Sequence, residues 1–531
     1  MTTKPDQPPL DIEQEVEARR AAEQQRSVPV KEDTAPIIPS NIVRESLWAN
    51  EVGDGVIYAT LHRDRLVYNH NIGAWLIWTD HSWDFDRMQR ALAAVSSVVE
   101  VYKAERSKVR LEMKDTSQSK DTIDYLGALE KQLSSRINRL QSNAGRENCL
   151  KAAASINDPL AITGLDLDSH PMLLACANGV IDLTTGDFAP GRPDQYLTMA
   201  SPIEFTGLMS KAPRWERFLV EAFDGDMEKV TYVLKLLGYA ITGAVKVAIF
   251  PVLYGAHGRN GKTTIMEIMY HILGPLAGPI PTEMLLRQRN GRSASGPSPD
   301  VMSLKGRRLV VASEPNEGER FDMGKIKKYS GSDTLEGRNP HDKYIVNFRP
   351  SHTLFLLTNE KPGAKYDDMA LWERLRCIDF PFSFVSYPDP DKPYQKQADE
   401  NLLDELKGEA SGILASLVRG CLLWQKEGLQ SPESIKADTE QWRQNEDILA
   451  PFLEECCVEK PGAVESAQIL YQTFSKHWEV TVNKKSVPSA KKFGTWMKAK
   501  YNDSKSNGNI VYHGLMISPQ LSSRYAGDSE A

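Results

Sequence analysis

A glycine-rich segment has the composition of a loop that holds phosphate groups. It reads Gly255-Ala-His-Gly-Arg-Asn-Gly-Lys-Thr-Thr264, after the apolar run 249–254 and before the helix-patterned run 265–273. A strand, a tight loop and a helix are expected in that order. Glycine lets several backbone N–H groups turn toward one anion, and the start of the helix adds its dipole. One departure is visible, because Ala256 stands where the first glycine is usual and Gly255 comes just before it.

The residue types of this loop predict a nucleotide site with ATP and Mg²⁺ as cofactors. Lys262 is expected to reach the β- and γ-phosphates, and the Thr263 hydroxyl to bind Mg²⁺. The whole predicted phosphate-binding set is Gly255, Ala256, Gly258, Asn260, Gly261, Lys262, Thr263 and Thr264. A purely structural glycine-rich turn is the alternative, and the flanking strand and helix argue against it.

Two later apolar runs also end in polar residues. The run 309–312 is followed by Ser313 and Glu314. A carboxylate beside the loop can orient Mg²⁺ and polarise the attacking water, so Glu314 is a candidate metal and catalytic residue. Whether Glu314 has both tasks, or Ser313 holds the metal through a water, stays open. The run 353–358 is followed by Asn359, whose side chain is expected to point between the loop and Glu314.

Arg374 and Arg376 lie further along, in the segment Leu-Trp-Glu-Arg-Leu-Arg. Two interpretations remain for them. They are salt-bridge partners at the edge of the core, or they reach into the ATP site of a neighbouring subunit.

The elements that must position these residues alternate along the chain. From about 210 to 385, short buried strands alternate with helices, which predicts an α/β fold with a parallel sheet covered on both faces. A helix-rich stretch follows at 400–445. Before the sheet, short alternating runs and then a helical stretch at 86–155 predict an α+β unit. We expect a solvated helical hairpin or a protomer contact in its charged part, not a catalytic role.

Composition excludes several classes of protein. The 531 residues carry 64 basic and 71 acidic side chains, a net charge of −7. No apolar window approaches the ~18 residues of a membrane span, and the first residues do not resemble a signal peptide. Six cysteines form no CxxC pair, which disfavours zinc ribbons and disulfides and favours a reducing cytoplasm. Residues 1–45 lack aromatic side chains, so an acidic disordered tail, with one frayed helix near 11–26, is expected.

The order of five segments resembles the superfamily 3 helicases. The glycine-rich loop, LVVASE, SGSDT, LLTNEKP and LWERLR follow one another as in the phage and plasmid primase–helicase family and its poxvirus relatives. The resemblance covers roughly residues 46–520 and includes the upstream NGVIDLTTG segment. It implies an AAA+-like ATPase that forms a ring, usually a hexamer, and moves along single-stranded DNA.

The resemblance also implies roles for single residues. Lys262 and Thr263 match the P-loop, Glu314 the Walker B acid, and Asn359 the first sensor. Arg374 matches the finger, with Arg376 as second candidate because family members often have two adjacent arginines where this chain has Glu373-Arg374. A β-hairpin before the sensor strand grips DNA in these motors, and 337–344 lies in the matching place. Its candidate DNA contacts are Arg338, His341 and Lys343, with an ordinary polar turn as the alternative.

Two other basic segments are candidates for DNA contact. Arg287, Arg289 and Arg292 lie in a loop that either lines the pore or is simply a flexible surface loop. Residues 484–500 carry six lysines and no acid, which shows that the acidic total does not argue against DNA as a partner. The last unit resembles a winged helix, with 489–501 as its reading helix and Lys491, Lys492 and Lys498 as phosphate contacts. A solvated lysine face is the alternative.

These observations predict an ATP-dependent DNA helicase acting in replication of a phage, plasmid or integrated element. The domains expected are a tail at 1–45, an α+β unit at 46–209, the ATPase at 210–445 and the winged helix at 446–531. Expected partners are single-stranded and forked DNA, further copies of the chain and a separate primase or initiator, in a bacterial host's cytoplasm and without a membrane. No convincing carboxylate set supports primer synthesis. An ATP-switched, origin-binding initiator is the alternative function, and a small-molecule P-loop kinase is the third.

Overall fold

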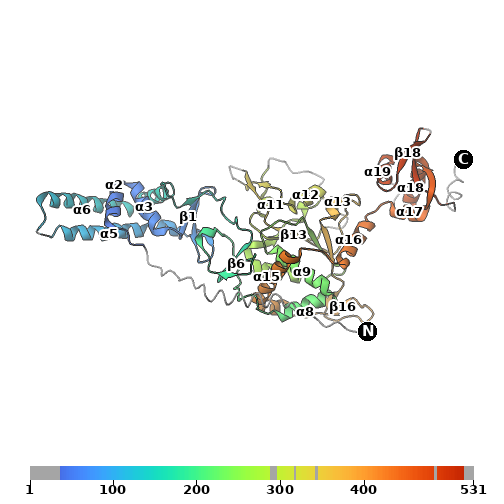
Figure 1. The fold of residues 1–531 in the computed structure, drawn as a ribbon, viewed down its shortest axis with the longest axis horizontal. Helices are drawn as coiled ribbons and strands as arrows, with labels where there is room; N and C mark the ends of the chain where they lie inside the picture. The colour runs from blue at the N-terminus through green and yellow to red at the C-terminus, as the bar shows by residue number, and fades with distance from the viewer. Residues whose placement is uncertain are drawn as a thin grey trace.

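The protein consists of three units arranged in a row (Figure 1). The computed structural model describes residues 36–115, 117–287, 296–315, 319–340, 345–482, 487–506 and 508–519. Residues 1–35, most of the expected tail with its helix near 11–26, lie outside this part. Helix α2 (Ser40–Trp48) begins within the rest of the expected tail and buries Val43, so the folded chain starts earlier than predicted. No helix in the described part is long and apolar enough to cross a membrane.

The N-terminal unit combines helices with a small sheet. Its helices are α2, α3 (Glu51–His62), α4 (Arg90–Ala93), α5 (Val95–Glu112), α6 (Lys120–Leu140) and α7 (Asn143–Ala153). The strands β1 (Leu66–Asn69), β2 (Ala74–Trp78), β3 (Trp83–Phe85) and β4 (Ala161–Ile162) are ordered β3-β2-β1-β4. Helices α5 and α6 form the predicted hairpin at the far end of the molecule (Figure 1). Its leucines at three- and four-residue spacing, Leu126, Leu129 and Leu133, are buried.

A second small sheet connects this unit to the centre of the protein. Strands β5 (Leu173–Cys176), β6 (Gly179–Asp182) and β7 (Phe188–Ala189) pair in sequence order and antiparallel, as the two turn signals predicted, and η1 (Pro193–Gln195) follows. Arg308, at the start of a central strand, is buried and donates hydrogen bonds to the carbonyls of Leu173 and Ile241. The guanidinium therefore ties β5 to the central unit.

Replacing this arginine is expected to loosen the junction. Arg308→Met leaves two buried carbonyls without donors, at a cost of about 1–3 kcal/mol each. We expect a lower melting temperature and new protease cleavage between the two units. Lys305→Met, at an exposed neighbouring position, is the matched control. An Arg308→Met protein with wild-type melting and cleavage would contradict this role.

The central unit is built on a parallel sheet, as predicted; the sheet has five strands, three of which the sequence indicated. Its strands are β8 (Phe250–Tyr254), β9 (Ala277–Pro279), β10 (Leu309–Ser313), β13 (Thr353–Thr358) and β14 (Leu375–Asp379), ordered β14-β8-β13-β10-β9. Successive side chains enter different cores. Val252 and Leu356 pack in one core and Leu253 and Leu357 in the other, because neighbouring residues of a strand face opposite sides.

Helices cover both faces of this sheet. One core contains residues from α8 (Pro213–Ala222), α9 (Met227–Ala240), α10 (Lys262–Leu273), α14 (Leu402–Gly408) and α15 (Ala410–Glu427). The other contains residues from α11 (Pro299–Met302), α12 (Met323–Tyr329), α13 (Met369–Trp372) and α16 (Glu433–Asn445). Short elements complete the unit: η2 (Gly274–Leu276), η3 (Thr282–Met284), the antiparallel pair β11 (Leu335–Gly337) and β12 (Val346–Phe348), and the parallel pair β15 (Ser383–Val385) and β16 (Gln395–Gln397).

The C-terminal unit has a small core of its own. It contains α17 (Ala450–Cys456), β17 (Cys457–Ser466), α18 (Ala467–Thr481), α19 (Ala490–Lys500), β18 (Asp503–Ser506) and β19 (Asn509–Ile517), with strands ordered β17-β19-β18. Phe452, Phe474, Phe493 and Met497 are among the residues that fill the core. The closing strand and the two helices agree with the sequence prediction. Residues after α16 connect this unit to the centre, and it lies at the opposite end from α5 and α6 (Figure 1).

Candidate active site

The candidate residues lie where strands of the parallel sheet end. Thr358 pairs with Tyr254, Tyr254 pairs with Asp379, and Ser313 pairs with Leu357. The residues that follow β8, β10 and β13 therefore emerge at one edge of the sheet. In open α/β sheets, ligands bind outside the carboxyl ends of the strands. A ligand-binding site is therefore expected at this edge of the sheet.

The glycine-rich loop joins β8 to α10 at this edge. Gly261 precedes the helix with a φ of 88°, and Arg259 has a φ of 61°, so two residues of the loop take left-handed backbone. A Cβ on Gly255 would collide with the amide of Asn260 and lie 3.1 Å from the Lys262 amine. At Gly258 a Cβ would meet open space. The Asn260 amide donates to the carbonyl of His257 at 2.8 Å and closes the loop on itself.

Lys262 is the first residue of α10, and its side chain is only 5% exposed. Its amine donates to the Asn359 side-chain oxygen at 2.7 Å and to the Gly255 carbonyl at 3.3 Å. The predicted placement of Asn359 beside the loop is therefore realised. Burial lowers the pKa of Lys262 to about 8, although the carboxylates of Glu314 and Asp379 oppose this shift. A buried amine held by two neutral acceptors is well placed to bind an anion.

Glu314 stands at the end of β10 with an exposed side chain and a φ of 49°. Its N–H donates to the Leu357 carbonyl at 2.9 Å, which fixes this strained backbone against β13. Non-glycine residues in left-handed conformation cost free energy and gather at functional sites. Ser313 and Thr263 also have exposed side chains at this edge. Three oxygen-bearing side chains thus accompany the loop.

Two features of this edge were not predicted from the sequence. Asp379 ends β14 and interacts electrostatically with Lys262; burial and the charge of Asp438 raise the pKa of Asp379. The β15–β16 pair supports the loop from outside: the Ser383 hydroxyl donates to the Gly258 carbonyl at 2.7 Å. The His257 ring also stacks on Tyr394, with centroids 4.1 Å apart. In the sequence, the only signal for Asp379 is its position at the end of a strand. No sequence signal indicates that Ser383 and Tyr394 support the loop, because these contacts join residues that are distant in sequence.

Arg374 and Arg376 lie at the opposite side of the sheet from the loop, where the strands β14 and β8 begin. The Arg374 carbonyl accepts a hydrogen bond from the N–H of Phe250, the first residue of β8, and the loop starts five residues later, about 16 Å along the strand. The Nη1 atom of Arg374 is buried without a partner in the described part of the chain. The Arg376 guanidinium donates to the carbonyls of Glu373 and Leu375, both at 2.8 Å. In the described part of the chain, neither arginine contacts the glycine-rich loop.

The pKa of Lys262 predicts a pH dependence of anion binding. Below about pH 8 the amine is charged and attracts phosphate; above it, the free protein loses the charge and must take up a proton on binding. The affinity for a non-hydrolysable ATP analogue should fall by up to about tenfold per pH unit above pH 8. Lys262→Arg, which stays charged, should show a flat profile. Parallel profiles for the two proteins would contradict the assignment.

The structure describes only part of the predicted DNA-binding hairpin. Strands β11 and β12 pair antiparallel, Leu335 with Phe348 and Gly337 with Val346, as the two predicted arms. His341 and Lys343 lie outside the described residues, as do Arg289 and Arg292 of the other loop. Arg338 is half-buried, and its backbone exchanges hydrogen bonds with Ser298.

The lysines of α19 differ in their surroundings. Lys491 and Lys492 are exposed on the first turn of the helix, with the Lys492 amine 5.6 Å from the Trp496 ring centroid. The Lys498 amine instead forms an ion pair with Asp503 at 2.7 Å, and Lys500 pairs with Asp447. Lys484 and Lys485 lie outside the described residues. The charge available on this helix is therefore concentrated at its N-terminal end.

Comparisons with known proteins agree with the resemblance read from the sequence. Residues 56–224 match a family model described as "D5 N terminal like". "Putative helicase L207/L206" of Acanthamoeba polyphaga mimivirus is 25% identical over 456 residues, which cover 83% of this chain and 46% of the relative. "Putative helicase 022R" of Frog virus 3 is 23% identical, and the match covers 66% of this chain and 43% of that protein. "Putative primase C962R" of African swine fever virus is 25% identical, and the match covers 56% of this chain and 32% of that protein.

The chain thus spans less than half the length of these curated relatives. Among solved structures, the C-terminal region of NrS-1 aligns with a TM-score of 0.44 at 12% identity, covering 84% of this chain and 95% of that one. The expectation that the chain makes no primers stays a prediction. The matched N-terminal segment and the relatives named as helicases and primases make the chain similar to the D5-like superfamily 3 helicase–primases, in agreement with the resemblance described above.

Proposed function

We propose that this protein is an ATP-dependent, ring-forming DNA helicase that acts in the replication of a virus, phage or other mobile element. One observation carries the proposal. The buried amine of Lys262 lies between the glycine-rich loop and Asn359, at the edge where Glu314 also emerges. This is the arrangement that a phosphate loop and a catalytic carboxylate require. The relatives named as helicases support the same replication role.

The residues at this edge suit ATP with Mg²⁺. Mg²⁺ prefers oxygen ligands and keeps several waters, so the exposed Thr263 hydroxyl and Glu314 carboxylate fit as its protein contacts. Bound Mg²⁺ neutralises charge on the phosphates. The loop N–H groups and Lys262 hold the phosphates, Asn359 orients the amine, and Glu314 positions the attacking water and accepts its proton. Ser313 remains the alternative contact to the metal, through a water.

In this proposal the finger comes from a neighbouring protomer. Arg374 lies at the opposite edge of the sheet from its own loop, so it can complete only the site of another copy. The strand order supports an AAA+-like P-loop ATPase, and such ATPases commonly assemble as rings, here a hexamer. ATP would then bind between protomers, and turnover would move the β11–β12 hairpin, with His341 and Lys343, along one DNA strand.

The C-terminal unit is proposed as a winged helix that binds DNA. Helices α18 and α19 and the β18–β19 hairpin form a compact unit with its own core. Lys491 and Lys492 are exposed at the start of α19, which suits phosphate contacts that are salt-dependent and not sequence-specific. Lys498 is the weakest of the three predicted contacts because Asp503 already holds it.

An origin-binding initiator without processive unwinding is the second candidate. The separate core of the C-terminal unit favours it, because such a unit can hold DNA without the motor. Two measurements test the helicase proposal. One is the ATP turnover of the full chain with and without oligo(dT), and the other is electron microscopy of the protein with ATP. We expect turnover stimulated by single strands and closed rings. A monomer whose turnover ignores DNA would contradict the helicase and favour a phosphotransferase.

A further inference from the structure

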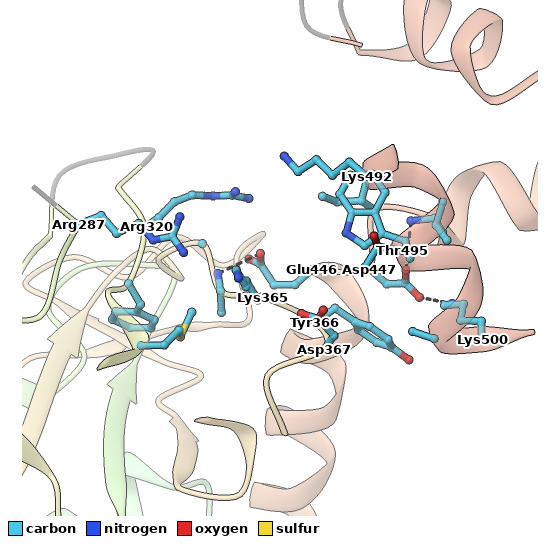
Figure 2. Close-up of a pocket in the computed structure, with 18 residues that line it drawn as sticks. Arg287, Arg320, Lys365, Tyr366, Asp367, Glu446, Asp447, Lys492, Thr495 and Lys500 are labelled. Carbon is cyan, nitrogen blue, oxygen red and sulfur yellow. Dashed lines mark hydrogen bonds and ion pairs between the residues drawn. The ribbon is translucent and has the colours of Figure 1, made fainter. Parts of the chain in front are cut away.

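A cleft separates the central unit from the C-terminal unit (Figure 2), and none of the residues that line it belongs to the candidate active site. Its volume is about 440 Å³. The central unit contributes Arg287, Arg320, Lys365 and Tyr366, and the C-terminal unit contributes Lys492, Thr495, Trp496 and Lys500. Three acids also line it: Asp367 of the central unit, and Glu446 and Asp447 in the connection between the two units.

Arg287, Arg320 and Lys492 are available basic side chains of the cleft, whereas Lys500 is paired with an acid; Asp367 is an exposed acid of the lining. Within the described part of the chain, no ion pair or side-chain hydrogen bond engages Arg287 or Lys492, and both are exposed. Asp447 pairs with Lys500, and Glu446 accepts a hydrogen bond from the Ala364 N–H at 3.0 Å. Arg320 acts electrostatically on Glu446 but remains exposed. The cleft therefore presents positive charge from two walls.

The position of Arg320 is set by a glycine. A Cβ on Gly363 would lie 2.9 Å from its Nε atom and 3.0 Å from its Cγ atom, so the arginine stem rests directly on that backbone. Figure 2 shows Arg287 and Arg320 on one wall and Lys492 on the other.

Aromatic rings alternate with these charges. Trp496 is half-buried at the wall of the cleft, beside the Lys492 amine. Tyr366 on the facing unit is half-buried too, with the Lys500 amine 5.3 Å from its ring centroid. Proteins that bind single-stranded nucleic acid combine a basic groove with rings on which unpaired bases stack. A cavity of this volume lies in the range that holds small ligands, so it suits a nucleotide or two of a longer strand.

We propose that this cleft binds a segment of single-stranded DNA, with a base stacked on Trp496 and phosphates held by Arg287, Arg320 and Lys492. Stacking needs unpaired bases, which favours a single strand over a duplex. Because the contacts come from both units, bound DNA holds the C-terminal unit against the central one. The inference deepens the proposed function and rests on the protein acting on DNA.

Binding of fluorescent oligo(dT) to the full chain without ATP tests the cleft. Trp496→Ala should weaken binding by about 5- to 150-fold, which corresponds to the loss of one stacked base. Arg320→Ala should reduce the slope of log affinity against log salt by about 0.7, one phosphate contact on a single strand, and Lys492→Glu, which reverses a charge, by at least as much. Trp48→Ala and Arg192→Ala, at exposed positions outside the lining of the cleft, are matched controls with no expected effect.

Crosslinking gives a second measurement that does not depend on a variant folding. An oligonucleotide carrying 5-iododeoxyuridine, irradiated on the wild-type protein, should label the peptide that contains Trp496 or Tyr366. The proposal that the cleft binds DNA is wrong if the label is found only in other peptides. It is also wrong if Trp496→Ala and Lys492→Glu leave the affinity and the salt slope unchanged. If the wild type separates strands while these variants bind normally, only the cleft is wrong. If the variants lose binding but the wild type separates no strands, the helicase is wrong and the cleft stands.

Discussion

Replacing Lys262 with alanine is expected to lower ATP turnover by roughly 10²- to 10³-fold, the usual effect of removing one preorganised electrostatic contact to a transition state. The amine is the buried cation at the carboxyl edge of the sheet, 2.7 Å from Asn359. Without it, the phosphates lose their charged contact and Asn359 loses its partner. Steady-state phosphate release at saturating ATP and Mg²⁺, with and without oligo(dT), measures the change.

The same substitution should change stability little, and this separates a catalytic effect from misfolding. Removing the buried amine relieves a desolvation cost, but it also leaves Asn359 and the Gly255 carbonyl without their donor. Because these two effects oppose each other, we expect a melting temperature close to that of the wild type. Lys436→Ala, at an exposed lysine that pairs with Glu433 at 2.7 Å, is the control for losing a positive charge. Wild-type turnover in Lys262→Ala would refute the phosphate-loop assignment.

Loss of Arg374 should lower turnover at least as much, and a second subunit that carries a different defect should restore part of the activity. An arginine finger contributes about 10³–10⁵ to turnover. Arg374→Ala keeps its own loop intact and should remove only the contact to the neighbour. Lys262→Ala has the reverse defect. Mixing the two inactive proteins before ring assembly should therefore restore part of the turnover, because some interfaces combine an intact loop with an intact Arg374.

The mixing experiment also distinguishes the two arginines. Arg376 is tied to the carbonyls of Glu373 and Leu375, which suits a positioning task within its own chain. Arg376→Ala should consequently lower the melting temperature more than Arg374→Ala does. Titrating the mixing ratio checks that recovered turnover follows the expected fraction of repaired interfaces. Turnover that never rises above the sum of the two variants would show that Arg374 does not act between subunits.

The sheet and the loop were predictable because their signals are local. Apolar runs bounded by turn residues predicted β8, β10 and β13, and the parallel arrangement then required Asn359 and Glu314 to emerge near Lys262. The helical hairpin was predictable for a similar reason, because leucines at three- and four-residue spacing predict one buried face.

What the sequence did not reveal depends on contacts between distant segments. Asp379 joins the site only because β14 lies beside β8 in the sheet order. The support of the loop by Ser383 and Tyr394 has no spacing pattern. Lys498 looked available for DNA, and only the approach of the β18 strand brings Asp503 to it. The cleft likewise joins Arg320 and Trp496 from two separate units.

Strand separation tests the central claim most directly. A forked DNA duplex with one labelled strand, incubated with the full chain, ATP and Mg²⁺, should yield free labelled strand over time. Lys262→Ala, or the wild type without ATP, should yield none. If the wild type hydrolyses ATP in response to DNA but releases no strand at any protein concentration, the protein is not a helicase, and the ATP-switched initiator replaces it.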